Sequence, residues 1–154
     1  MIRSNRSSIA AFAFAATLSA RAQASGNIDA ASFAWSENGG WINFAPNAGP
    51  GVTVGDGGLT GYAWTENFGW ISLAPLAGGV SNQFGKLSGY AWGENAGWIN
   101  FAPVPGGVFI DTDGEFSGWA WGENIGWINF HTQRAVVTTW SGSDRIFADG
   151  FERL

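Results

Sequence analysis

The sequence predicts an all-β protein made of four tandem repeats, each a short three-stranded antiparallel unit, that together form a single repeat domain. The main observation is a motif, aromatic-Ala-Trp-x-Glu-Asn-x-Gly-Trp-Ile, that occurs four times in the 154 residues. Its first tryptophan stands at Trp35, Trp64, Trp92 and Trp121, so the steps between copies are 29, 28 and 29 residues. A period of this size is typical of proteins in which each repeat buries its apolar face against its neighbours. The pattern leaves open whether the repeats close into a ring or form an open stack.

The centre of each copy predicts a β-hairpin. In the third copy, residues 94–97 (Glu-Asn-Ala-Gly) suit a type I turn followed by a left-handed glycine, which is the three-residue hairpin loop with a G1 bulge. This loop would place Trp92 opposite Asn100. Aromatic and polar side chains then share one face of the hairpin, and small residues share the other face with Ile and Phe. Positive φ is expected at the glycines that end the four turns, Gly40, Gly69, Gly97 and Gly126.

An apolar segment after each hairpin predicts the third strand of the repeat. These segments contain 52–54, Val80, 108–110 and 136–137. Turn signals such as Asp56-Gly57 and Asp113-Gly114 lead back into the next copy. Because each repeat has an odd number of strands, repeats of identical orientation need one corner or crossover, for which the loop after the Ala-Pro pair is the candidate.

The tryptophan-rich face has two interpretations. Aliphatic residues are sparse and cysteine is absent, so we expect the rings, which remove about 150–250 Å² each from water when buried, to form the core. The Glu-Asn pairs would then satisfy turn amides and indole N–H groups, and Trp92→Ala would cost about 3–5 kcal/mol. In the alternative, the rings stack on sugars. The candidate carbohydrate-binding residues of this alternative are Trp35, Glu37, Trp41, Trp64, Glu66, Trp70, Trp92, Glu94, Trp98, Trp121, Glu123 and Trp127.

The two ends of the chain lie outside the repeat. Residues 1–24 have the basic start, the apolar run at 9–20 and the Ala-Gln-Ala cleavage site of a secretory signal peptide. The repeat domain is expected over 25–140, and 141–154 reads as a C-terminal tail that is either a sorting tag or a cap on the last repeat. The mature protein is therefore expected to be extracellular, on the cell surface or periplasmic, and no later segment is apolar enough for a membrane helix.

The composition argues against most chemistries. Removing the leader leaves four basic and 12 acidic side chains, a net charge of −8 that disfavours nucleic acid as a partner. We expect no cofactor and no metal, because cysteine is absent and His131 is the only histidine. The carboxylates at 111–115 are read as an Asp-Gly turn rather than a calcium loop. Glutamates that recur in nearly identical surroundings do not suit a glycosidase, which needs two carboxylates of different pKa. The chain is therefore not expected to be an enzyme.

The repeated AWxENxGWI core resembles the tandem repeat of uncharacterised exported bacterial proteins that carry GYAWxENxGWI units. The resemblance covers most of the chain after the leader and implies an exported β-repeat protein with no assigned activity. The ending Ile146 to Glu152 (IFADGFE) similarly resembles short C-terminal tails of some exported gammaproteobacterial proteins. We expect a non-enzymatic structural or adhesive protein, with a lectin-like carbohydrate-binding module as the alternative. The expected partners are cell-surface polysaccharide or other surface proteins.

Overall fold

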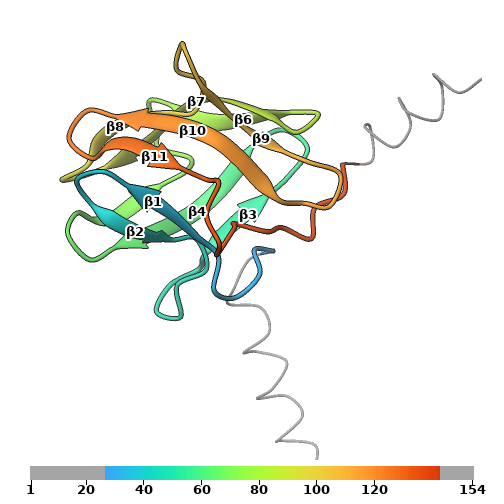
Figure 1. Cartoon of the computed structure of the whole chain (residues 1–154), viewed down its shortest axis with the longest axis horizontal. Helices are drawn as coiled ribbons and strands as arrows, with labels where there is room; N and C mark the ends of the chain where they lie inside the picture. The colour runs from blue at the N-terminus through green and yellow to red at the C-terminus, as the bar shows by residue number, and fades with distance from the viewer. Residues whose placement is uncertain (1–26, 143–154) are drawn as a thin grey trace, which may run out of the picture.

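The computed structural model describes residues 27–142, and the predicted leader and the tail after residue 142 lie outside this range. The described residues form an all-β domain, as expected (Figure 1). Its strands are β1 (Phe33–Ser36), β2 (Gly40–Asn43), β3 (Val52–Val54), β4 (Leu59–Thr65), β5 (Gly69–Ser72), β6 (Gly79–Gln83), β7 (Lys86–Gly93), β8 (Gly97–Asn100), β9 (Gly107–Ile110), β10 (Phe116–Gly122) and β11 (Gly126–Asn129). Within 27–142 there is no helix of the length and apolarity that a membrane span requires.

Eight of these strands close into an antiparallel barrel. Each copy of the motif contributes one hairpin, and the hairpins pair side by side in the order β1-β2, β4-β5, β7-β8 and β10-β11. The last hairpin then returns to the first, since β11 pairs with β1 through Trp35 opposite Asn129 (Figure 1). The ring is therefore closed, and this arrangement removes the free sheet edges that an open stack would leave.

The hairpins have the expected faces but a different register. In the third copy Trp92 lies opposite Trp98, not opposite Asn100, and Gly93 lies opposite Gly97. A two-residue difference keeps every side chain on its expected face, because side chains along a strand alternate with a period of two. The prediction for the turn glycines is confirmed: φ is 71° at Gly40, 79° at Gly69, 74° at Gly97 and 77° at Gly126.

The prediction that the tryptophan rings form the core is wrong. The core is the opposite face of each hairpin, where an alanine pairs with an isoleucine, as in Ala34 with Ile42 and Ala120 with Ile128. An eight-stranded barrel has an interior just wide enough to be filled by side chains, and small residues opposite medium ones fit that width. Cross-strand pairs of tryptophan would not fit, so the rings lie outside. Trp92, for example, is 38% exposed.

A second layer of short strands closes the barrel at the end opposite the hairpin turns. It consists of β3, β6 and β9, which pair with the first halves of β4, β7 and β10. The expected corner is found after the Ala-Pro pair. There the chain leaves the barrel at the end of β2, loops out and continues into β3 of the second layer, where Val52 N–H donates to the Phe44 carbonyl at 3.0 Å. Because β2 and β3 both run antiparallel to β4, neighbouring repeats keep the same orientation.

A glycine divides each long strand between the two layers. Gly61, Gly89 and Gly118 have φ of 85°, 86° and 89°, and a Cβ at any of them would overlap a carbonyl oxygen of the preceding repeat's chain. Only glycine combines this backbone angle with this approach. These residues are the glycines of the Gly-aromatic pairs in the motif, so the pair marks where the strand bends into the barrel.

The segment after the last hairpin completes the ring in the second layer. Phe33 N–H donates to the Arg134 carbonyl and Asp29 N–H to the Val137 carbonyl, each at 2.8 Å. On its other side the same segment receives a hydrogen bond from Phe116 N–H at the Val136 carbonyl. It therefore occupies the position of the third strand in the fourth repeat, and it lies between the last repeat and the first.

Candidate functional site

The outer surface of the barrel carries one pair of tryptophans per repeat. Directly opposed rings belong to the same hairpin, as Trp35 and Trp41, whose centroids are 5.0 Å apart at 77°. Trp64 and Trp70 repeat this contact at 4.8 Å and 62°. A third aromatic side chain extends each pair. These third residues are Phe33, Tyr62, Tyr90 and Trp119. The aromatic side chains thus form four similar clusters around the barrel, each open to solvent.

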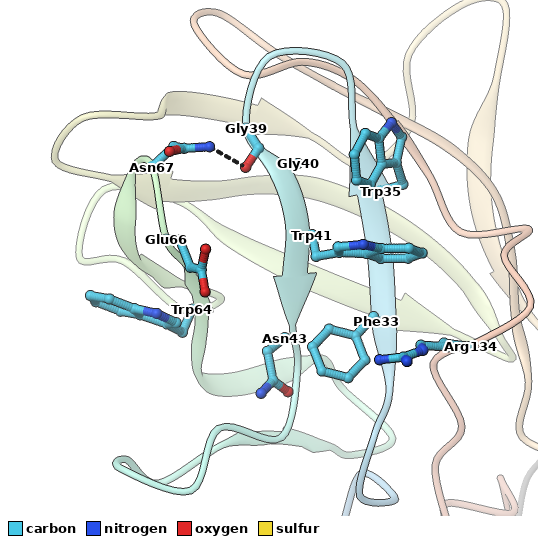
Figure 2. A pocket seen from close by; sticks show the side chains of 10 residues that line it. All are labelled: Phe33, Trp35, Gly39, Gly40, Trp41, Asn43, Trp64, Glu66, Asn67 and Arg134. Carbon is cyan, nitrogen blue, oxygen red and sulfur yellow. Dashed lines mark hydrogen bonds between the residues drawn. The ribbon is translucent and has the colours of Figure 1, made fainter.

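Grooves run between neighbouring clusters, and the one between the first and second repeats has a volume of about 510 Å³. Its aromatic walls are Trp41 and Phe33 of the first repeat and Trp64 of the second. Figure 2 shows Glu66 and Asn67 on the Trp64 side, and Arg134 on the opposite side beside Phe33. We call this the first groove. Its size falls within the range of pockets that bind small molecules.

A related groove lies between the fourth repeat and the first. It has a volume of about 400 Å³ and is lined by Trp119, Trp127, Glu37, Pro105 and Gly106. Trp127 and Glu37 occupy the repeat positions that Trp41 and Glu66 occupy in the first groove. The two grooves therefore share a tryptophan and a glutamate at equivalent repeat positions. They differ in the segment beside the aromatic cluster, which contributes Arg134 to the first groove and Pro105 and Gly106 to the related groove.

The asparagines of the turns join the repeats to one another, and Asn67 also lines the first groove. Each Nδ2 donates to a backbone carbonyl in the adjoining turn at 2.9–3.2 Å. The four bonds run from Asn38 to Asn124, from Asn124 to Asn95, from Asn95 to Phe68 and from Asn67 to Gly39. Together they form a closed circuit around the turn end of the barrel.

Two of the four glutamates have a similar structural role. Glu37 Oε2 accepts the Trp127 backbone N–H and Glu123 Oε2 accepts the Trp98 backbone N–H, both at 3.0 Å. The expectation that these side chains satisfy backbone amides is borne out for this pair, although the amides belong to the neighbouring repeat. Glu66 makes no such bond within the described residues and lines the first groove instead.

The structure therefore separates the twelve residues predicted for carbohydrate binding into two groups. The eight tryptophans all lie on the outer face, where five are more than one third exposed and Trp64, Trp98 and Trp127 are half-buried. The glutamates lie at the turn end of the barrel, with Glu66 in the first groove and Glu37 in the related groove. No single location unites all twelve residues. The ring pairs are repeated around the barrel, and each groove takes its walls from two repeats.

Sequence reasoning missed two features of this region. The variable residue of each Glu-Asn-x-Gly turn looks unimportant, yet Gly39, Ala96 and Ile125 are buried and plug the turn end of the barrel. Arg134 was also missed as a groove residue. The available signal was positional: seven residues after the second tryptophan of each copy stand Ala48, Ala77, Pro105 and Arg134, so one copy places a charge where the others do not.

The polar groups that line the grooves are side-chain amides, carboxylates and the Arg134 guanidinium. Among residues 27–142 no group of three or more His, Asp or Glu side chains is arranged to hold a metal ion. The gap at the centre of the interior, between Ile42, Phe101 and their neighbours, is about 10 Å³, which is far smaller than a small-molecule site. The outer face of the barrel provides flat aromatic surfaces, with amide, carboxylate and guanidinium groups at their margins.

Comparisons with known proteins give no relative for this chain: no family model, no curated protein and no solved structure matches it.

Proposed function

We propose that this chain is an exported, non-enzymatic adhesive protein that binds carbohydrate through the tryptophans on the outside of its barrel. The observation that carries the proposal is the outward position of the ring pairs. Trp35, Trp41 and Trp121 are 43%, 45% and 41% exposed, although burying them would give more apolar stabilisation than burying any other residue type.

Sugars suit these surfaces for a chemical reason. A pyranose ring has an apolar face of C–H groups and a rim of hydroxyls, so it is recognised by a flat aromatic surface with a few polar groups beside it. The first groove provides this combination, with Trp41 and Trp64 as walls and Asn43 and Glu66 as hydrogen-bonding groups. Fluctuating loops are not needed to build it, because all four residues lie on barrel strands or on the turn that follows β4.

Fluorescence quenching tests the proposal directly. Half-exposed indoles are accessible to acrylamide, and a bound oligosaccharide would shield them. We expect at least one of cellohexaose, chitohexaose, xylohexaose and mannohexaose to reduce quenching in a saturable manner. Trp41→Ala and Trp64→Ala should weaken this binding at least fivefold without unfolding the protein. Trp140→Phe is the matched control, since Trp140 lies away from the groove and donates its indole N–H to Asp56 at 2.8 Å. If no oligosaccharide, neutral or acidic, reduces the quenching, the proposal fails.

A purely structural surface protein without a sugar ligand is the second candidate. The edge-to-face contacts between paired rings favour it, because each contact covers part of a ring that would otherwise stack on a sugar. Unchanged quenching with all four saccharides, together with a large loss of stability in Trp41→Ala, would support this candidate instead.

A further inference from the structure

We propose that the first groove selects acidic saccharides, with the Arg134 guanidinium binding a uronic-acid carboxylate while Trp41 and Trp64 contact the pyranose rings. This inference rests on the carbohydrate-binding function proposed above and names its substrate class. It starts from the difference between the first groove and the related groove, in which Pro105 and Gly106 stand where the first groove has Arg134.

Arg134 is held in position by its backbone. Its carbonyl accepts Phe33 N–H at 2.8 Å and its own N–H donates to Thr132 Oγ1 at 3.3 Å. Thr132 Oγ1 in turn donates to the Phe33 carbonyl at 2.9 Å. These bonds fix the Arg134 segment against β1, so the side chain enters the groove from a rigid wall.

The guanidinium has no carboxylate partner within the part of the chain that the structure describes. It lies over the Phe33 ring, with its central carbon 5.6 Å from the ring centroid. This cation–π contact holds the guanidinium beside the ring while its N–H donors stay available at the groove wall. An arginine held in this way is suited to a planar carboxylate, which it binds through two parallel N–H···O hydrogen bonds.

The charge of the rest of the surface limits the ligand to one of low charge density. Residues 27–142 contain nine acidic side chains and two basic ones, Lys86 and Arg134. Lys86 begins β7 and pairs with Phe109 in the second layer, far in the fold from the hairpin faces. A densely sulfated polymer would meet repulsion everywhere else on the protein. A glycan with one carboxylate per sugar ring can place one charge on Arg134.

The acidic group in the groove lies apart from the arginine. Figure 2 shows Glu66 on the Trp64 side of β2 and Arg134 on the Phe33 side. A sugar that spans the groove would therefore present its carboxylate to Arg134 at one end and donate a hydroxyl to Glu66 at the other. The two charges then fix the direction in which the glycan lies.

The test compares trigalacturonic acid with its methyl ester, which keeps the rings and removes the charges. Calorimetric titration of the mature protein should give at least tenfold tighter binding of the acid, as expected for a charge-assisted hydrogen-bond pair. Arg134→Gln should remove this preference, so that the acid and the ester bind with similar affinity. Arg134→Lys should restore it only in part, because an ammonium cannot form the bidentate contact. Lys86→Gln is the control for general charge and should keep the preference.

The outcomes separate this inference from the function on which it rests. If the protein binds the acid and the ester equally, or if Arg134→Gln keeps the preference, the inference fails while carbohydrate binding stands. If neither trisaccharide binds but one of the neutral hexaoses does, the inference also fails alone. If no saccharide of either set binds, both proposals fail. Thermal melts of each variant establish that a lost affinity comes from the groove and not from unfolding.

Discussion

Ile125 and Gly122 form a close contact at the turn end of the barrel, and we expect their substitutions to be strongly coupled. A Cβ at Gly122 would overlap Cγ2 of Ile125, while the next atom in reach, Cγ1 of Ile99, is 3.1 Å away. Gly122→Ala should therefore cost about 1–3 kcal/mol, as overpacking does. Ile125→Ala removes a fully buried side chain and should cost about 2–4 kcal/mol, or roughly 10 °C in Tm for a domain of this size.

The double variant is the informative one. Once Cγ2 is absent, the overlap at Gly122 is relieved and the 3.1 Å approach to Ile99 Cγ1 remains, while an alanine there reduces the entropy of the unfolded chain, which is worth about 0.4–1 kcal/mol. Gly122→Ala should therefore destabilise the Ile125→Ala background by clearly less than it destabilises the wild type. Urea unfolding followed by tryptophan emission gives all four free energies of the cycle. Gly57→Ala, at a site with nothing within 4 Å, is the control and should change little. Additive effects would refute the packing argument.

Two further predictions concern backbone geometry and chain length. Gly89→Ala should destabilise by more than about 2 kcal/mol in urea unfolding, since its φ is 86° and a Cβ would overlap the Gly79 carbonyl; a loss like that of Gly57→Ala would contradict this. Truncation after Ser143 should leave Tm within a few degrees, because the ring is completed by 134–138, whereas truncation after Gln133 should abolish the cooperative melt. A large drop in Tm for the protein truncated after Ser143 would show instead that the tail caps the last repeat.

Much of the fold could be predicted because the pattern is local. The period, the hairpins and the two faces follow from alternation and turn chemistry within each copy, and a register error of two residues left the faces unchanged. Ring closure could not be predicted, since it depends on contacts between Asp29 and Val137 at opposite ends of the domain. The repeated motif does not indicate the angle between neighbouring hairpins, and this angle decides whether four of them close into a barrel.

The wrong choice of core has a geometric reason. Apolar area favours tryptophan as a core residue, but the width of the barrel interior decides which side chains fit. Ala91 opposite Ile99 fills that width, and Trp92 opposite Trp98 would exceed it. For the candidate site, the tryptophans were named from the repeated motif, as part of the carbohydrate-binding alternative. Arg134 was not, because its groove forms only when the segment after the fourth hairpin reaches Phe33 of the first repeat.

The hydrogen bond between Thr139 N–H and the Asn27 carbonyl, 3.0 Å long, places the two ends of the described domain next to each other. The four junctions between hairpins share one strand register, with Ile42 opposite Thr65 at the first junction and Ile128 opposite Ser36 at the last. A circular permutant that joins these ends through a short linker and opens the chain at the exposed loop around Asn47 and Ala48 would retain every strand pairing. The ring has four places at which its chain can begin, of which this sequence uses one.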